Sequence, residues 1–322
     1  MHEIEYAALA AQTGEAVGDS LLDVVDARTR LAGSNRMEIL LFSLGTGESF
    51  GINVFKVKEV CNAPVLTRMP NMPRGVQGIV SLRGHIITVI DPGEFIALGG
   101  SRQQTGANLI VTEYSRHTVG FLAHGVDRII RVDWERVKAP EAMLTGGGSL
   151  ITAITEMPDG RLVSILDVEQ ILADAFGETV VADLGRIEGA AGTCVFFADD
   201  SVVARRKIVE VLDQLGLQHQ HATNGREAWE RLLALADQAG QEGVRDRIGL
   251  ILVDAEMPEM DGYVLTRNIK ADPRFDGIPV VMHSSLSSSA NRAMGQSVGV
   301  DAYVAKFDPA ALAAALRPLL RG

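Results

Sequence analysis

Five polar side chains in the second half of the chain are of the types that bind a cation and a phosphoryl group. Asp199 and Asp200 follow one apolar run, Asp254 and Ser284 each end another, and Lys306 follows a later one. Carboxylate and phosphate oxygens are ligands that Mg²⁺ prefers, while an ammonium group and a hydroxyl can bind phosphoryl oxygens. A carboxylate can also act as the nucleophile in phosphoryl transfer. The residue types therefore indicate a Mg²⁺-assisted site in which Asp254 accepts a phosphoryl group.

The sequence from Thr193 onward alternates short apolar runs with segments of helical periodicity. The expected strands are 194–198, 217–222, 250–254, 279–284 and 301–304. The expected helices are 202–215, 226–239, 262–271, 291–298 and 309–320. Such alternation predicts an α/β doubly wound domain over residues 194–322 with a five-stranded parallel sheet. Because parallel strands end at the same edge of a sheet, we expect the five polar side chains to share one cleft.

Each of these residues also has an ordinary structural explanation. An aspartate after a strand, such as Asp254, is common as a turn former or a helix N-cap, and Asp200 could cap the next helix. Ser284 could belong to the polar loop that follows it, and Lys306 could be a solvated surface lysine. Independent caps and loop residues need not all fall at one edge of a sheet, so we favour a shared site.

Residues 194–321 resemble a two-component receiver domain, which has a flavodoxin-like fold. The resemblance rests on the Asp199-Asp200 pair, on Asp254 within the stretch Asp254-Ala-Glu-Met-Pro-Glu-Met-Asp-Gly262, on Ser284 and on Lys306. It implies that a histidine kinase phosphorylates Asp254. It also implies a Mg²⁺ site formed by Asp199, Asp200, Asp254 and the backbone carbonyl of Glu256.

The same resemblance indicates which residues act as the conformational switch, and the sequence departs from the family at one position. Ser284 and Tyr303 fall at the positions of the family's switch residues, and Lys306 is expected to bind the phosphoryl group. Receivers usually have a proline after this lysine, where the present chain has Phe307. The usual cis peptide at that bond is therefore in doubt, because a non-proline cis bond costs about 2.5 to 4 kcal/mol.

The first half of the chain has a different texture and carries no cluster of catalytic or metal-binding residue types. Strand-like runs occur at 38–44, 49–55, 77–82, 85–90, 108–112, 119–123 and 162–166, and an amphipathic helix is expected at 168–176. Turn formers separate the runs at the spacing of an all-β barrel or sandwich. We therefore expect a mostly β domain over 37–176, preceded by an arm with a short helix (1–36) and followed by a linker (177–193).

This β half resembles the CheW family of chemotaxis coupling proteins. The resemblance rests on Gly51 to Val60 and on Gly78 to Asp91, in which Ser81-Leu-Arg-Gly84 stands where the family usually has Asn-Leu-Arg-Gly. It implies two small β-barrels that bind chemoreceptor tips and the histidine kinase CheA. The residues expected to contact partners are Val57, Glu59, Arg83 and Gly84. The alternative is that Glu59 and Arg83 form only an internal ion pair.

The composition limits the remaining possibilities. The 322 residues carry a net charge of −11, which argues against nucleic acid as a partner because neutralising phosphates requires a basic face. The two cysteines have no metal-ligand spacing and suit a reducing compartment. No apolar stretch approaches 18 residues, so we expect a cytoplasmic protein without direct membrane insertion.

A CheW-like module joined to a receiver is the arrangement of CheV-type proteins, which the whole chain resembles. We therefore expect an adaptor that couples chemoreceptors to CheA, with coupling modulated by phosphorylation at Asp254. It would be no enzyme apart from catalysing its own phosphoryl transfer and dephosphorylation. The alternative is a phosphate sink, in which the receiver drains phosphoryl groups from CheA and the CheW-like half provides localisation.

Overall fold

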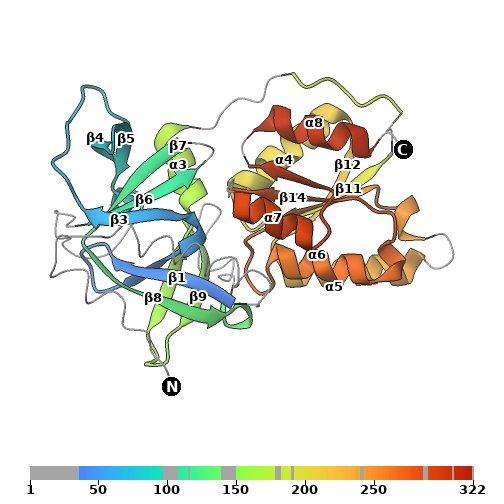
Figure 1. Cartoon of the computed structure of the whole chain (residues 1–322), viewed down its shortest axis with the longest axis horizontal. Helices are drawn as coiled ribbons and strands as arrows, with labels where there is room; N and C mark the ends of the chain where they lie inside the picture. The colour runs from blue at the N-terminus through green and yellow to red at the C-terminus, as the bar shows by residue number, and fades with distance from the viewer. Residues whose placement is uncertain are drawn as a thin grey trace. The chain divides into compact units, whose positions relative to one another are not determined.

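The computed structural model describes residues 36–96, 108–114, 117–138, 150–177, 183–189, 192–239, 243–285, 289–306 and 308–320. The chain divides into two compact units, Met1–Gly177 and Glu178–Gly322, which are described here one at a time (Figure 1). The helix expected in the N-terminal arm and the peptide bond at Phe307 lie outside the described residues.

The first unit consists of two five-stranded sheets and a helix. One sheet has the order β8-β1-β2-β10-β9, with β1 Arg36–Ser43, β2 Ser49–Asn53, β8 Gly125–Asp133, β9 Ile151–Glu156 and β10 Leu162–Leu166. The other has the order β3-β6-β7-β5-β4, with β3 Val57–Asn62, β4 Val76–Leu82, β5 His85–Ile90, β6 Asn108–Tyr114 and β7 His117–Ala123. An isolated bridge, Lys138↔Ile154, links the segment after β8 to β9, and a second, Thr67↔Ile79, links the segment after β3 to β4. The two edges of each sheet are thereby brought together as in a small barrel.

Strand β1 is buried on both faces, which explains its apolar run from Ile39 to Phe42. Ile39 and Leu41 point into the first barrel with Trp134, which belongs to the short 3₁₀ helix η3 (Trp134–Arg136). Leu40 and Phe42 alternate with them and pack into a second cluster, shared with the other barrel and with helix α3 (Val168–Phe176). A strand between two cores cannot alternate apolar and polar residues as a half-exposed strand does.

The second unit is a parallel sheet covered by helices on both faces, as predicted (Figure 1). Its strand order is β12-β11-β13-β14-β15, with β11 Cys194–Ala198, β12 Gln218–Ala222, β13 Leu250–Asp254, β14 Val280–Ser284 and β15 Ala302–Ala305. Its helices are α4 Val202–Leu215, α5 Gly225–Ala239, α6 Gly262–Ala271, α7 Ser289–Ser297 and α8 Pro309–Leu319. Short 3₁₀ turns occupy η4 Val244–Asp246 and η5 Pro273–Phe275.

The central strands of this sheet are apolar on both faces because each face meets helices. In β11, Val195 and Phe197 belong to the core against α4 and α8, whereas Phe196 and Ala198 belong to the core against α5 and α6. In β13 all five residues are buried, including the terminal Asp254. The apolar runs in the sequence therefore do mark buried parallel strands.

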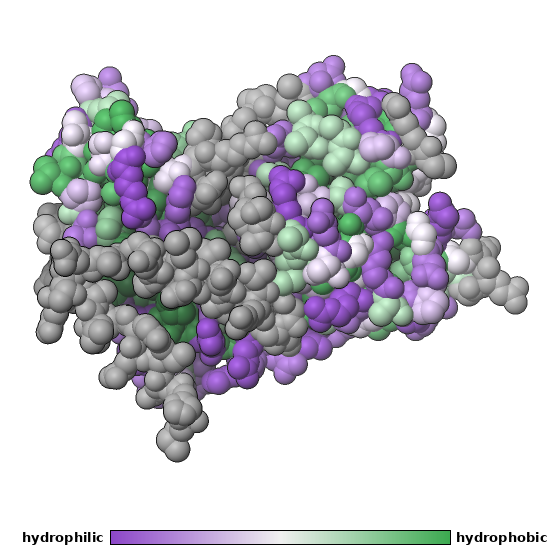
Figure 2. All heavy atoms as spheres, viewed as in Figure 1, coloured by the Kyte–Doolittle hydropathy of each residue, from purple (hydrophilic) through white to green (hydrophobic). Residues whose placement is uncertain are grey.

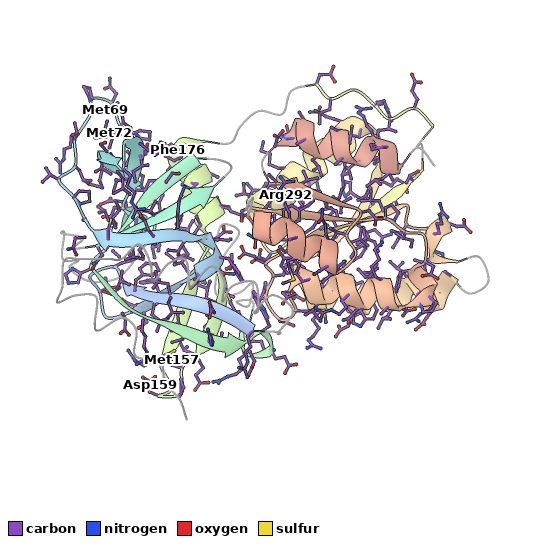
Figure 3. All side chains as sticks on the ribbon, in the orientation of Figure 1. Met69, Met72, Met157, Asp159, Phe176 and Arg292 are labelled. Atoms are coloured by element: carbon purple, nitrogen blue, oxygen red, sulfur yellow. The ribbon has the colours of Figure 1, made fainter. Side chains whose placement is uncertain are left out.

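The surface of the first unit exposes a few large apolar residues. Val65 is 95% exposed and Ile86, in β5, is 74% exposed. Figure 2 shows apolar surface where β4 and β5 lie, and Figure 3 places Met69 and Met72 at the same end of the unit. Of the helices in the described ranges, none combines the length and the hydropathy needed to span a bilayer.

Candidate phosphoryl-acceptor and metal site

Three carboxylates meet at the carboxyl edge of the receiver sheet. Strands β11 and β13 are parallel neighbours with Ala198 opposite Val253, so the next residues, Asp199 and Asp254, lie side by side. One oxygen from each of Asp199, Asp200 and Asp254 lies within 4.8 Å of the others. Asp199 and Asp254 are buried, and Asp200 is partly exposed. The structure thus brings together the three acidic residues singled out from the sequence.

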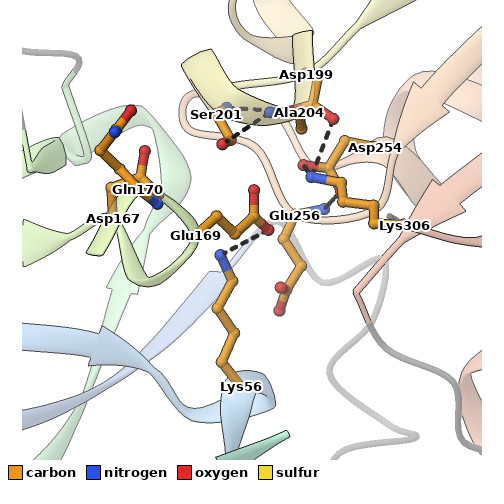
Figure 4. Close-up of polar contacts among 10 residues, drawn as sticks. All are labelled: Lys56, Asp167, Glu169, Gln170, Asp199, Ser201, Ala204, Asp254, Glu256 and Lys306. Carbon is orange, nitrogen blue, oxygen red and sulfur yellow. Dashed lines mark hydrogen bonds and ion pairs between the residues drawn. The ribbon is translucent and has the colours of Figure 1, made fainter. Parts of the chain in front are cut away.

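Lys306 lies between two of these carboxylates (Figure 4). Its Nζ is 2.7 Å from Asp254 Oδ2 and 3.0 Å from Asp199 Oδ2, and its side chain is only 2% exposed. The backbone amide of Lys306 donates to the carbonyl of Ser284 on β14, which holds the loop after β15 against the site. Lys306 is therefore a buried part of the acidic site and not a solvated surface residue.

Backbone amides orient the carboxylates on the side away from Lys306. Asp199 Oδ1 accepts a hydrogen bond from the amide of Ser201 at 2.9 Å, and Asp254 Oδ1 accepts one from the amide of Glu256 at 3.3 Å. Ser201 caps helix α4 through its hydroxyl, which accepts from the amide of Ala204. The N-cap of α4 is therefore Ser201 and not Asp200.

The donor set fits Mg²⁺. When all are ionised, three carboxylates and one ammonium group leave an excess of two negative charges in a largely buried site. Such an excess is costly unless a cation compensates it, and oxygen donors of this kind suit Mg²⁺. Asp199, Asp200 and Asp254 would hold the ion. The predicted contribution of the backbone carbonyl of Glu256 stays a prediction.

Ser284 and Tyr303 lie on neighbouring strands beside this site. Ser284 is fully buried at the end of β14, and Tyr303 on β15 is paired with Met282 of β14. Burial raises the pKa of Tyr303 to about 12, and the hydroxyl of Ser284 acts in the opposite direction. The guanidinium of Arg292, labelled in Figure 3, lies 5.6 Å from the centre of the Tyr303 ring. The role of Ser284 and Tyr303 as switch residues is compatible with this placement and stays a prediction.

Sequence reasoning did not single out Tyr263, which follows Gly262 at the start of α6. Its side chain is 5% exposed, and burial raises its pKa well above the ordinary value. The charges of Glu256 and Asp261 raise it further, so the phenol stays protonated. The only signal in the sequence is its position immediately after the Asp-Gly pair that ends the acidic motif.

The acceptor strand and helix α6 approach each other closely at Gly262. The Gly262 amide donates to the carbonyl of Ala255 at 3.0 Å. A Cβ at Gly262 would lie 1.9 Å from the carbonyl oxygen of Asp254. Only glycine allows this approach, and it fixes where the acceptor strand ends.

Asp261 gives the receiver a pH-dependent stability. It caps α6 by accepting from the Val264 amide at 2.7 Å, and burial raises its pKa to about 6. A carboxyl whose pKa is higher in the folded state stabilises the fold fully below its unfolded pKa of about 3.9. That stabilisation is lost as the pH rises through about 6.

Asp261→Asn should keep the cap and remove the buried charge. We expect its receiver to be more stable than wild type at pH 7.5, by up to about 2 to 3 kcal/mol, and the two to converge near pH 4. Urea denaturation of the full-length proteins at several pH values measures this difference. A stability difference that is the same at pH 4 and pH 7.5 would contradict the assignment of the titrating group.

The arginine-glycine pair of the CheW-like motif forms the turn between β4 and β5. Leu82 pairs with His85, and the two residues between them have positive φ, 50° for Arg83 and 83° for Gly84. Two consecutive positive φ values define the tight hairpin turn that matches strand twist, and glycine is favoured there. The motif therefore projects the arginine from the tip of a hairpin.

Glu59 and Arg83 form an ion pair, as the structural alternative supposes. Their side-chain atoms are 2.8 Å apart, with 71% of the Arg83 side chain exposed against 11% of Glu59. Arg83 thus remains accessible while paired. Val57 is 7% exposed and packs in the core shared by the two barrels. The predicted partner contacts of all four residues stay predictions.

Comparison with known proteins agrees with this two-part architecture. Residues 38–176 match the CheW-like domain family, and residues 195–317 match the response regulator receiver domain family. Chemotaxis protein CheV3 of Helicobacter pylori is 32% identical over 269 residues, covering 80% of this chain and 84% of that protein. Chemotaxis protein CheV1 of the same organism is 28% identical over 318 residues, covering 91% and 96%. Chemotaxis protein CheW of Klebsiella aerogenes is 29% identical over 147 residues, covering 45% and 87%.

A CheW-like double barrel followed by a receiver with an acidic site defines a two-domain class of chemotaxis protein. The chain belongs to the CheV family.

Proposed function

We propose that this protein is an adaptor that couples chemoreceptors to the histidine kinase CheA and that phosphorylation of Asp254 modulates the coupling. The observation that carries the proposal is the placement of Asp254 at the end of β13, paired with the buried Lys306, in a chain whose other half is CheW-like. The other matched domain of the chain is the CheW-like domain, and we take it as the target of the receiver.

The chemistry at Asp254 is a phosphoryl transfer from a phosphohistidine of the kinase. A P–O bond forms to a carboxylate oxygen of Asp254 while the P–N bond to the histidine breaks. Bound Mg²⁺ would neutralise charge on the phosphoryl group. The ammonium group of Lys306 places a fixed positive charge beside the Asp254 carboxylate, and the hydroxyl of Ser284 would donate a hydrogen bond to the phosphoryl group. The product adds negative charge to a buried site, and this added charge drives the predicted rearrangement near Ser284 and Tyr303.

Asp254→Ala in the full-length protein tests the acceptor. We expect no labelling by radioactively phosphorylated CheA in the presence of Mg²⁺, because the variant lacks the carboxylate proposed as the acceptor. Asp199, which also pairs with Lys306, is proposed only to hold the ion. Asp276→Ala, at an exposed turn of the same domain, is the control and should be labelled as the wild type is. Labelling of Asp254→Ala at the wild-type rate would show that Asp254 is not the phosphoryl acceptor.

The same variant separates modulated coupling from a phosphate sink. The measurement is CheA activity in receptor complexes that contain either the wild-type protein or Asp254→Ala, with phosphate flux to a second receiver followed in parallel. Modulated coupling predicts that activation of CheA differs between the two proteins. A sink predicts unchanged activation and altered flux. Failure of the wild-type protein to bind either receptor or CheA would overturn the adaptor role itself, and with it association with receptor arrays.

A further inference from the structure

A segment ahead of the receiver match is bound to the receiver surface. Residues 183–189, which we call the strap, precede β11 and lie outside the matched residues 195–317. The amide of Leu184 donates to Gln214 Oε1 at 3.0 Å, and the amide of Ile187 donates to the carbonyl of Leu215 at 3.0 Å. Both partners belong to the last turn of α4, so the strap begins the receiver and is not free linker.

Arg317 on α8 holds the other side of the strap. Its guanidinium donates to the carbonyl of Gly185 at 2.7 Å, to that of Arg186 at 3.2 Å and to that of Leu184. One side chain thus satisfies three consecutive backbone carbonyls of an irregular segment. Charge-assisted hydrogen bonds of this kind are among the stronger polar contacts in proteins.

Apolar packing fixes the strap between the two helices. Ile187 is 5% exposed and belongs to the same core cluster as Leu215 of α4 and Leu316 of α8. Helix α4 ends at Gly216 in a left-handed conformation, and a Cβ there would lie 2.7 Å from Nε of Arg186. The strap therefore contacts the ends of α4 and α8 with backbone, apolar and charged groups together.

Helix α8 connects the strap to the acceptor site. Lys306, paired with Asp254, lies two residues before Asp308, which caps α8 by accepting from the Ala311 amide at 2.9 Å. Arg317 lies near the opposite end of this 11-residue helix. A helix moves as a nearly rigid rod, so a shift of the loop that carries Lys306 displaces Arg317 and the strap with it.

We propose that the strap transmits the phosphorylation state of Asp254 to the CheW-like module and that Arg317 is the positioning residue of this connection. The inference rests on the proposed function. Only residues 178–182 lie between the strap and Gly177, the C-cap of α3 in the CheW-like module. Five residues are a short connection, so a displacement of the strap on α8 changes where the chain from α3 must reach the receiver.

Arg317→Ala in the full-length protein tests the inference, and Arg247→Ala is the matched control. Arg247 also donates to a backbone carbonyl, that of Gln238, but lies far from the strap in sequence. Loss of three hydrogen bonds should speed amide hydrogen exchange of Ile187 by about tenfold or more. Labelling of Asp254 by CheA should stay within about twofold of wild type, because the acceptor site is intact. The phosphorylation-dependent change in CheA activation should fall by at least half in this variant and stay at the wild-type level in the control.

The outcomes separate the inference from the proposed function. If amide hydrogen exchange at Ile187 is faster in Arg317→Ala but the phosphorylation-dependent change in CheA activation is as large as in wild type, transmission through the strap is wrong. Unchanged exchange at Ile187 would show that Arg317 does not hold the strap. If the wild-type protein itself shows no phosphorylation-dependent change although Asp254 is labelled, the modulation of coupling fails and transmission fails with it. A loss shared by Arg317→Ala and Arg247→Ala would point to general destabilisation and contradict the specific role.

Discussion

Substitution of alanine for Gly262 is expected to destabilise the receiver by about 3 kcal/mol or more and to impair phosphorylation of Asp254. The added Cβ would lie 1.9 Å from the carbonyl oxygen of Asp254 and 2.8 Å from its carbonyl carbon, both of which are backbone atoms. Neither can rotate away as a flexible side chain could. Relief requires α6 or the end of β13 to shift, and a shift of β13 displaces the acceptor carboxylate.

Urea denaturation of the full-length protein, together with labelling by phosphorylated CheA, measures both effects. Gly47→Ala is the control, because a Cβ there meets no heavy atom within 4 Å and its φ does not favour glycine. We expect the control to change stability by no more than about 1 kcal/mol. A Gly262→Ala protein with a wild-type unfolding midpoint would show that the two elements separate more easily than the structure indicates.

Removal of the buried ammonium group by Lys306→Met should have the second large effect. Lys306 Nζ compensates Asp254 and Asp199, and breaking a buried ion pair from one side costs about 3 to 5 kcal/mol. Labelling of Asp254 should fall by about two orders of magnitude, as is typical when a group that stabilises transition-state charge is removed. Lys270→Met is the control, because Lys270 pairs with Asp301 at a partly exposed site and should cost about 1 kcal/mol or less.

The magnesium dependence of Lys306→Met makes the prediction specific to the acidic site. Without the lysine, three carboxylates remain close together and no ammonium group offsets them. A ligand stabilises the folded state in proportion to the logarithm of its concentration over its dissociation constant, and a more negative site should bind Mg²⁺ more tightly. Added Mg²⁺ should therefore raise the melting temperature of the variant more than that of the wild type. An equal rise in both would contradict a shared site for the ion and the lysine.

The receiver fold could be predicted from the sequence because its elements carry strong local signals. Runs such as Cys194–Ala198 are apolar on both faces, and α4 ends at Gly216 after a regular stripe. The clustering of the acidic side chains at one edge of the sheet could be predicted from the parallel topology alone. The strap could not be predicted, because residues 183–189 have no periodicity and are ordered by contacts to Arg317, more than 130 residues later. The burial of Tyr263 could not be predicted for the same reason, since it comes from the tertiary fold.

Three strands of the CheW-like unit were not predicted, each for a physical reason. Strand β3 starts immediately after the 3₁₀ helix η1 (Val54–Lys56), with no turn residue to separate them. Strand β8 lies at a sheet edge, and its Asp127, Arg128 and Arg131 obscure its alternation. Strand β9 is short and only two of its six residues are buried. For β3 and β8, pairing with a distant strand, and not local sequence preference, makes the segment a strand, whereas β9 pairs with the next strand, β10.

The topology of the CheW-like unit has a consequence for how it folds. All five strands of the second barrel lie within residues 57–123, whereas the first barrel pairs β1 with β8, so that Arg36 meets Asp133. Closing such a long loop costs more conformational entropy than forming the hairpins within residues 57–123, and contacts between distant residues slow folding. The second barrel can therefore form during synthesis before β8 and β10 have emerged. Once it has formed, the loop that must close when β1 pairs with β8 in the first barrel is effectively shorter. The hairpin that carries Arg83 belongs to the second barrel, which is closed by local pairings.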